Sequence, residues 1–380
     1  MNLDPVAVYV HTPFCPSKCG YCDFNSFALD GEIIERTVAA TVSEIERSYW
    51  RGRPAKTIFF GGGTPTFLSA EQLCRLLRTV IEAHPPVAGA EITSEANPGT
   101  VDAEKFSAMR AAGFNRLSLG AQSFQSGELI QLGRVHEASD IARAVQAARQ
   151  AGFDNLNLDL MFALPGQSPR TWEQNLKTAL ALRPDHLSLY CLTIEPNTRF
   201  HRYAQRGLLD LPDDESQVQM YDSACSLAEK AGFRQYEISN FCRPGFECEH
   251  NLCYWHEEEY LGYGPGAVGC FASSDDGRTR YTNQKHPERY CDALEGAIDM
   301  WCDSEVLDAD TLAFERWMLG IRLNEGVPVE GLSLDHSALE KFLDTGWIEE
   351  RDGSVFLTAE GRHFCTEITV AAWRELALRP

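Results

Sequence analysis

The sequence predicts an α/β fold in which a parallel β-sheet is covered by helices. A strand–loop–helix pattern recurs six times between residues 5 and 191, and such alternation is typical of parallel sheets. The cysteine-rich, glycine-rich and carboxylate-bearing segments also follow the carboxyl ends of predicted strands, where folds of this class bind ligands. A barrel and an open doubly wound sheet both satisfy this pattern.

The six predicted strands are short, apolar and rich in β-branched or aromatic residues, as expected for strands buried in a parallel sheet. The first, Pro5–Thr12, reads PVAVYVHT, and the second, Lys56–Phe60, reads KTIFF and runs into a glycine triplet. The other four are expected at Ala90–Glu95, Arg116–Gly120, Asn155–Leu160 and His186–Cys191.

The segments between these strands have helical periodicity and recognisable helix ends. Glu32–Trp50 carries charges on one side, and Ser69–Gln72 forms a capping box that opens the second helix. Glycine favours helix C-termini and proline favours the first helical turn. These signals place further helices at Asp102–Ala112 (ended by Gly113), Glu137–Ala151 (ended by Gly152) and Pro169–Leu182.

The chain changes character beyond residue 191. A helix at about residues 214–231 precedes a strand at Gln235–Ser239, and the region Arg243–Asn283 is expected to be irregular. From Ala309 helices lead to two alternating runs joined by Asp352-Gly353, which is a hairpin signal. This order predicts a small winged-helix-like module that packs against the rest of the protein, because the acidic charge disfavours DNA binding.

Composition excludes several classes of function. The 380 residues are 44% hydrophobic and 23% charged, with a net charge of −21. A chain this acidic is a poor nucleic-acid binder, since phosphate binding needs clustered Lys and Arg. No apolar run is long enough to span a membrane, and the N-terminus resembles no signal peptide. Thirteen cysteines without a secretory signal predict reduced thiols and a cytoplasmic location.

Three cysteines in one short loop are the most informative motif. Cys15, Cys19 and Cys22 have the spacing C-x3-C-x2-C, and nearby prolines and a glycine prevent a regular helix. Three thiolates can hold three irons of a [4Fe–4S] cubane and leave the fourth iron open to a chelating ligand. Two alternatives remain: a zinc site completed by His11, and a Cys19–Cys22 redox pair.

This loop resembles the signature of the radical S-adenosylmethionine (SAM) family. The segments Tyr9–Cys15, Gly61–Thr66, Gly120–Phe124 and Asn157–Leu160 are similar to its oxygen-independent coproporphyrinogen III oxidase group. Downstream, Tyr236–Phe241 and the H-N-x-x-Y-W segment His250–Trp255 resemble the haem-chaperone branch of that group. The resemblance implies a partial (β/α)6 radical SAM barrel at residues 1–240, a haem-associated segment at 241–305 and a winged-helix-like domain at 306–380.

The resemblance also implies roles for individual residues. Cys15, Cys19 and Cys22 would ligate the [4Fe–4S] cluster, and an electron from the cluster would cleave SAM to methionine and a 5′-deoxyadenosyl radical. SAM would be held by residues of several strand ends, namely Tyr9, Tyr21, Gly62, Gly63, Thr64, Glu95, Gln122, Arg134 and Asp159. Two alternatives stay open, because a glycine triplet is often only a tight turn, and carboxylates in apolar strands often form structural ion pairs.

His250 would serve haem, the cargo implied by the same resemblance. Haem iron is commonly held by histidine and its macrocycle needs an apolar wall, and His250 is followed by Tyr254 and Trp255. A lone histidine is more often structural, so that alternative remains. A second metal site made of Cys242, Cys248, Cys253 and His250 is a further alternative.

Two departures favour the chaperone branch over the decarboxylating enzyme. The enzyme has another cysteine two residues past the third ligand, where this chain has Phe24, and it has an N-terminal extension, whereas here the first ligand is residue 15. The expected function is therefore to bind haem and deliver it to an acceptor haem protein, including acceptors at membranes that are contacted transiently. An electron donor is a further implied partner. The alternative is radical SAM decarboxylation of coproporphyrinogen III to protoporphyrinogen IX.

Overall fold

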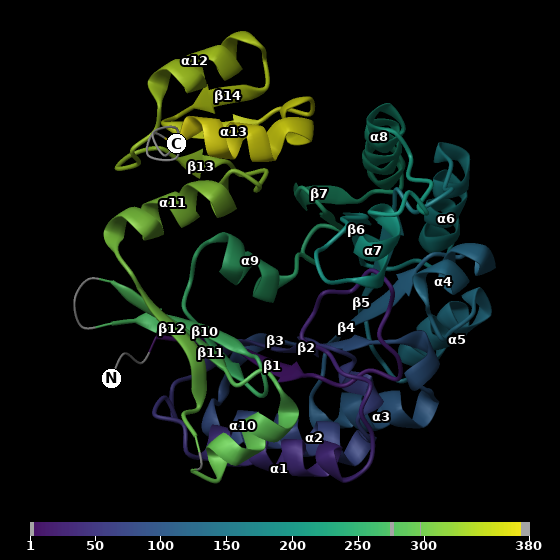
Figure 1. Cartoon of the computed structure of the whole chain (residues 1–380), viewed down its shortest axis with the longest axis vertical. Coiled ribbons are helices and arrows are strands. Elements are labelled where there is room, and N and C mark those ends of the chain that lie inside the picture. The colour runs from purple at the N-terminus through teal and green to yellow at the C-terminus, as the bar shows by residue number, and fades with distance from the viewer. Residues whose placement is uncertain (1–3, 274–276, 297, 374–380) are drawn as a thin grey trace.

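The computed structural model describes residues 4–273, 277–296 and 298–373. Figure 1 shows a broad curved sheet with helices on its outer face and a small separate layer of helices and strands at the C-terminal end. The sheet has twelve strands in the order β12-β11-β10-β9-β1-β2-β3-β4-β5-β6-β8-β7. Its two ends do not pair with each other, so the expected partial barrel is confirmed and it is open.

The six central strands are the parallel part of the sheet and match the six predicted from sequence. Each pairs in parallel with the next, from β1 with β2 to β5 with β6. They are β1 (Val6–Thr12), β2 (Ala55–Gly62), β3 (Pro86–Ala96), β4 (Arg116–Gln122), β5 (Asn155–Phe162) and β6 (His186–Cys191).

The helices on the outer face follow the sequence signals. Ser69 caps α2 through the predicted capping box with Gln72, and Gly113 ends α3 with a φ of 121°. The apolar sides of most of these helices form one continuous core with the strands, whereas Leu132 of α4 and Phe200 of α7 belong to a smaller separate cluster. They are α1 (Glu32–Glu46), α2 (Ala70–Ala83), α3 (Ala103–Ala112), α4 (Ser126–Leu132), α5 (Ala138–Gln150), α6 (Pro169–Ala181), α7 (Arg199–Ala204) and α8 (Asp214–Lys230), with 3-10 turns at Pro65–Phe67 and Pro98–Thr100.

The expectation of an irregular region at Arg243–Asn283 is wrong. After β7 (Arg234–Glu237) and β8 (Asn240–Cys242), this region forms α9 (Glu249–Trp255), β9 (Tyr260–Tyr263), β10 (Val268–Ala272) and β11 (Arg278–Asn283). β9 pairs in parallel with β1, and β10, β11 and β12 (Trp301–Leu307) extend the sheet as antiparallel strands. Pairing with a partner some 250 residues away in sequence, and not local alternation, makes β9 a strand. The helix α10 (Pro287–Leu294) covers this extension beside α1.

The C-terminal residues form a second core. It contains α11 (Ala309–Gly320), β13 (Val327–Pro328), α12 (His336–Asp344), β14 (Ile348–Arg351), β15 (Ser354–Leu357), a 3-10 turn at Gly361–Phe364 and α13 (Cys365–Ala372). The predicted hairpin joins β14 and β15, and Asp352 and Gly353 both have positive φ, as a tight hairpin turn requires. Figure 1 shows α9 between the sheet and α11.

Candidate functional site

A cavity of about 320 Å³ opens at the carboxyl ends of β1–β6. This volume lies within the range of small-molecule pockets, about 300–1,000 Å³. Most of the residues predicted for the site line it together, although they come from six different strand ends and loops. They are Cys15, Cys19, Cys22, Tyr21, Gly62, Gly63, Thr64, Glu95, Gln122, Arg134 and Asp159. Tyr9 and His250 are not among the lining residues.

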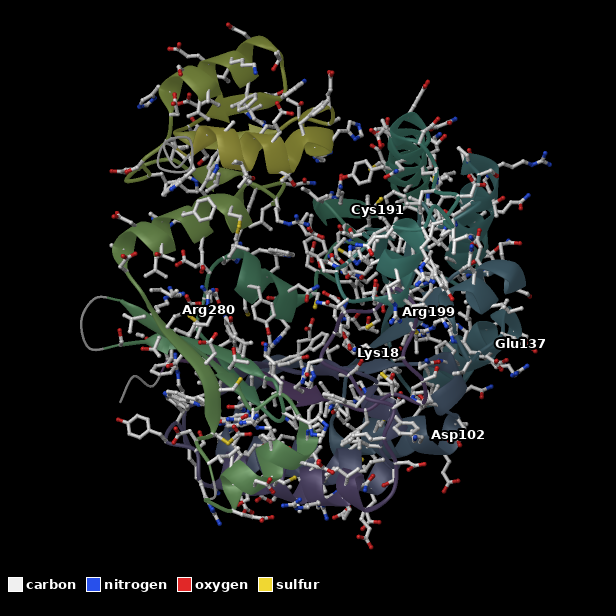
Figure 2. The ribbon with its side chains drawn as sticks, in the orientation of Figure 1. Lys18, Asp102, Glu137, Cys191, Arg199 and Arg280 are labelled. Carbon is white, nitrogen blue, oxygen red and sulfur yellow. The ribbon has the colours of Figure 1, made fainter. Side chains whose placement is uncertain are left out.

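The cysteine loop folds back on itself before it meets the cavity. Cys15 N–H donates to the carbonyl of Phe27, and Phe27 N–H donates to the carbonyl of Pro13. At the other end, a Cβ on Gly20 would lie 2.8 Å from the Arg199 guanidinium, so glycine allows the loop to contact α7. Lys18 of this loop and Arg199 of α7 are labelled in Figure 2. The three thiols are free and face the same cavity.

The thiols fit a cluster better than a single metal ion. In the described ranges, no three His, Cys, Asp or Glu side chains converge on a point where one ion would be held. Both nitrogens of His11 are already used, since Nδ1 lies 3.0 Å from the Tyr9 hydroxyl and Nε2 lies 2.9 Å from the Asn25 carbonyl. The zinc alternative with His11 therefore fails, and so does the second metal site around His250. A cubane instead distributes three thiolates over separate irons.

Polar groups around the thiols complete that side of the cavity. The Thr64 hydroxyl lies 3.5 Å from Cys15 Sγ, and Arg134 Nη1 lies 3.7 Å from Cys19 Sγ. Arg134 also donates from Nη2 to the Gly120 carbonyl at 2.8 Å, while its buried Nε has no hydrogen-bond partner among the described residues. A buried guanidinium with a free N–H beside an anionic cluster site suits a ligand carboxylate.

The glycine triplet brings two loops into contact. Gly62 has a φ of 107°, and its Cα faces the ring of His11. A Cβ on Gly63 would lie 2.7 Å from the Phe14 carbonyl oxygen and 2.8 Å from that of Thr12. The triplet is thus both a tight turn and a cavity wall, because only residues without a side chain allow the loop after β2 to lie directly on the cysteine loop.

Glu95 and Asp159 are two half-buried carboxylates that line the cavity. Glu95 accepts a hydrogen bond from Gly62 N–H at 3.2 Å, and Asp159 accepts from Ser118 and Asn157. Neither forms an ion pair within 4.0 Å in the described part of the chain, so the structural ion-pair alternative is wrong. Burial, followed by repulsion from Asp159, raises the pKa of Glu95 to about 8, and burial raises that of Asp159. A cationic ligand would offset the free-energy cost of ionising these two neighbouring carboxyl groups.

Three predicted residues lie at the edge of this arrangement or outside it. Tyr21 lines the cavity and packs edge-on against Phe200. Tyr9 lies behind the glycine turn, where its ring stacks on Phe59 and His250. His250 is 1% exposed, with Nδ1 2.8 Å from the Thr57 hydroxyl and Nε2 3.0 Å from the Tyr254 hydroxyl. In this arrangement His250 has no nitrogen available for a haem iron.

Sequence reasoning missed the polar residues that support the site. Ser118, Asn157 and Ser188 form hydrogen bonds with one another and with Asp159 inside the sheet. The signal was available in β5, where Asn157 and Asp159 alternate with leucines and therefore face the same side. The rim of the cavity also includes Tyr190 and the exposed Cys191, which is labelled in Figure 2.

Comparison with known proteins agrees with this geometry. Residues 9–179 match the Radical SAM superfamily, and residues 307–364 match the HemN C-terminal domain. In *Bacillus subtilis* a protein named "Heme chaperone HemW" is 37% identical over 97% of this chain and 100% of its own length. The *Escherichia coli* protein of the same name is 41% identical over 86% of this chain and 85% of its own.

A solved structure has the same fold. It is titled "Coproporphyrinogen III oxidase (HemN) from Escherichia coli is a Radical SAM enzyme", and it superposes with a TM-score of 0.82 over 97% of this chain and 89% of its own, at 24% identity. At that identity the likeness shows the fold alone. The full-length similarity to the *B. subtilis* and *E. coli* proteins shows more: the chain belongs to the HemW family of radical SAM proteins.

Proposed function

We propose that this protein is a haem chaperone, which binds haem and delivers it to acceptor haem proteins. The observation that carries the proposal is its similarity, over nearly the whole length of both chains, to the *B. subtilis* protein named for that function. The matched length includes α9 and the C-terminal domain as well as the cavity. A resemblance confined to the barrel would be shared with radical SAM enzymes of many kinds.

The cavity is the site of the family's cofactors, a [4Fe–4S] cluster and SAM. Cys15, Cys19 and Cys22 hold the cluster, which when bound supplies an open iron and an electron for reductive SAM cleavage. Gly62, Gly63 and Thr64 hold the methionyl end of SAM, and the Arg134 guanidinium pairs with its carboxylate. Glu95, Gln122, Asp159, Tyr21 and Tyr9 position the remaining parts, with Tyr9 acting from behind the glycine turn. The free Nε of Arg134 and the two unpaired carboxylates support this assignment.

Haem capture is assigned to α9 and its surroundings. Trp255 presents a buried Nε1 with no hydrogen-bond partner among the described residues, and Arg322 lies 4.8 Å from the centre of its ring. The rings of Tyr254 in α9 and Tyr260 in β9 pack edge-on against each other. For His250 to ligate iron, one of its two hydrogen bonds must be exchanged for the metal. Ligation therefore requires either that α9 shifts away from Thr57 or that the Tyr254 side chain, on the same helix, turns away from the His250 ring.

The wider organisation follows the same proposal. Residues 1–240 form the radical SAM core, 241–305 the haem-associated segment and 306–380 the C-terminal domain. The partners are haem, an acceptor haem protein and an electron donor, in the cytoplasm. In the described part of the chain no helix has the length and hydropathy needed to cross a bilayer.

The test compares two activities of one anaerobic preparation. Cluster-loaded protein is titrated with haem, and haem transfer to an apo-haem protein is followed by its absorption spectrum. The same protein is incubated with SAM, a reductant and coproporphyrinogen III, and the products are separated by chromatography. Saturable haem binding with transfer and no porphyrinogen product is expected. Repeated turnover to protoporphyrinogen IX without saturable haem binding would replace the proposal with the enzymatic alternative.

A further inference from the structure

A chain of buried and partly buried hydrogen bonds leads from the cavity to α9. It starts at Asp159, whose Oδ1 accepts from Asn157 Nδ2 at 2.7 Å. Asn157 Oδ1 lies 2.7 Å from His186 Nδ1, and His186 Nε2 lies 2.9 Å from the Tyr236 hydroxyl. The Tyr236 oxygen in turn accepts from the backbone N–H of Cys248 at 3.4 Å, and Cys248 is the N-cap residue of α9.

The direction of these bonds follows from their chemistry. Asn157 must donate to the carboxylate, so its oxygen faces His186, and His186 must carry its proton on Nδ1. His186 Nε2 then accepts from the Tyr236 hydroxyl, which leaves the Tyr236 oxygen free to accept from Cys248. Burial, followed by the nearby Arg116 charge, lowers the pKa of His186 well below its usual value, so the ring stays neutral. Each member therefore donates toward Asp159.

The far end of the chain is a helix whose N-terminus is held by polar contacts. Glu91 of β3 accepts from the backbone N–H groups of Glu249 and His250, at 3.1 and 3.3 Å, and from the Cys248 thiol at 3.5 Å. Thr57 of β2 holds the His250 ring. The position of the α9 N-terminus thus depends on β2, β3 and Tyr236 together.

We propose that His186 and Tyr236 are positioning residues for SAM, which act through Asn157 on Asp159 and make SAM binding depend on the docking of α9. The inference rests on SAM binding in the cavity, as proposed above. Hydrogen bonds that all point the same way polarise one another, so removal of a distant member weakens the last bond. The same chain transmits a shift of α9 to the Asp159 carboxylate.

The experiment measures SAM affinity by equilibrium dialysis with anaerobic, cluster-loaded, full-length protein. Tyr236→Phe removes the hydroxyl alone and should weaken SAM binding about threefold to tenfold, the effect of one net hydrogen bond. Tyr221→Phe is the matched control, because the Tyr221 hydroxyl is also internally bonded, to Ile238 and Gln235, but does not join the chain. It should leave SAM affinity unchanged.

A double-mutant cycle separates positioning from general destabilisation. In an Asp159→Asn background, Tyr236→Phe should cause no further loss, since the chain acts only through Asp159. Thr57→Val, which releases His250 from β2, should weaken SAM binding in the wild-type background and have little added effect in Tyr236→Phe. Equal losses in all backgrounds, or no loss, would overturn the proposal.

A second readout does not need the cluster. In the cluster-free protein, ¹⁵N shifts of His186 should report a neutral ring protonated on Nδ1, and Tyr236→Phe should alter the Nε2 shift. A ring protonated on Nε2 breaks the chain and would overturn the proposal. Failure of the wild-type cluster-loaded protein to bind SAM would instead contradict the proposed function, while the His186 shifts would still decide whether the chain exists.

Discussion

Arg322 and Glu237 form an ion pair that joins the C-terminal domain to the barrel. Arg322 Nη2 lies 3.1 Å from Glu237 Oε2, and Glu237 is fully buried next to β8. The guanidinium of Arg322 also lies over the ring of Trp255 in α9. One side chain just beyond the end of α11 therefore contacts both the sheet and the helix that we assign to haem capture.

Loss of the Arg322 charge should destabilise the fold. Arg322→Met leaves the Glu237 carboxylate buried without its cation, and breaking a buried pair in this way costs about 3 kcal/mol of unfolding free energy. Denaturant unfolding of the cluster-free protein measures the change. Lys177→Met is the control, because it removes an exposed ion pair with Glu173 and should change stability by less than about 0.5 kcal/mol. Similar values for the two variants would contradict the structural role of the pair.

Cys19→Ser should abolish cluster binding. Two thiolates hold a cubane poorly, so iron and labile sulfide in anaerobic protein should fall from about four each per chain to near zero. Cys191→Ser is a demanding control, since Cys191 lines the same cavity from β6 and is not a predicted ligand. It should retain the iron. Loss of iron in both variants, or zinc without sulfide in the wild type, would contradict the assignment.

Gly63→Ala should damage the cavity through contact alone. The added methyl group would lie against the carbonyl oxygens of Phe14 and Thr12, which are backbone atoms and cannot rotate away. Overpacking of this kind costs about 1–3 kcal/mol, and the displaced cysteine loop should bind cluster and SAM less tightly. At Gly127 of α4 a Cβ meets no other atom within 4 Å, so Gly127→Ala should leave both unchanged. Unaltered cluster content and SAM affinity in Gly63→Ala would refute the close approach.

SAM binding should release a proton from Glu95. With the cavity empty, a pKa of about 8 keeps this carboxyl mostly protonated at pH 7. The charged groups that act on it are Asp159, which raises its pKa, and Arg116, which lowers it; the Gly62 N–H also lowers it. A sulfonium ligand favours the ionised form, so affinity should rise as pH increases toward 8 and then level off.

Calorimetry in buffers of different ionisation enthalpy measures this proton. Glu95→Gln cannot ionise, so it should release fewer protons at pH 7 and show a flatter pH profile than the wild type. The comparison also removes any contribution from the amino group of SAM itself. Identical proton release in the two proteins would show that Glu95 is already ionised before SAM binds.

His250→Ala should reduce both stability and haem binding. The variant leaves the hydroxyls of Thr57 and Tyr254 without their partner and opens a cavity, at a cost of about 2–4 kcal/mol. His84→Ala is the matched control: His84 is equally buried and bonded on both nitrogens, to the Arg53 carbonyl and the Tyr263 hydroxyl. Both variants should lose stability, but only His250→Ala should change the Soret spectrum of bound haem. If haem bound to the two variants gave the same Soret spectrum, His250 would have only a packing role.

Local sequence signals predicted the barrel well. The β1–β6 strands are set by short apolar runs, and the Ser69 capping box and the Asp352-Gly353 turn act over a few residues. The cavity lining was also predictable, because strand ends meet at one edge of a parallel sheet. A motif that follows a strand end therefore locates a side chain without any knowledge of distant contacts.

The features that sequence reasoning could not give depend on distant partners. β9 is a strand because it pairs with β1, and Tyr260–Tyr263 carries no strong pattern of its own. The closed environment of His250 depends on Thr57, from a strand almost two hundred residues earlier in the chain. The sequence identified Asp159 but not the hydrogen-bond chain through His186 and Tyr236. Residues that form hydrogen bonds across strands have no characteristic spacing in the sequence.

The parallel pairing of β9 with β1 has a consequence for synthesis of the chain. Val8 on β1 lies opposite Leu261, so β1 keeps one unpaired edge during synthesis until β9, more than two hundred residues later, has emerged from the ribosome. Exposed apolar strand edges are templates for aggregation, and contacts this distant in sequence form slowly. The nascent barrel is therefore most vulnerable to misassembly before residues 260–263 arrive, and truncations that end before β9 should form inclusion bodies even though they retain the whole cavity.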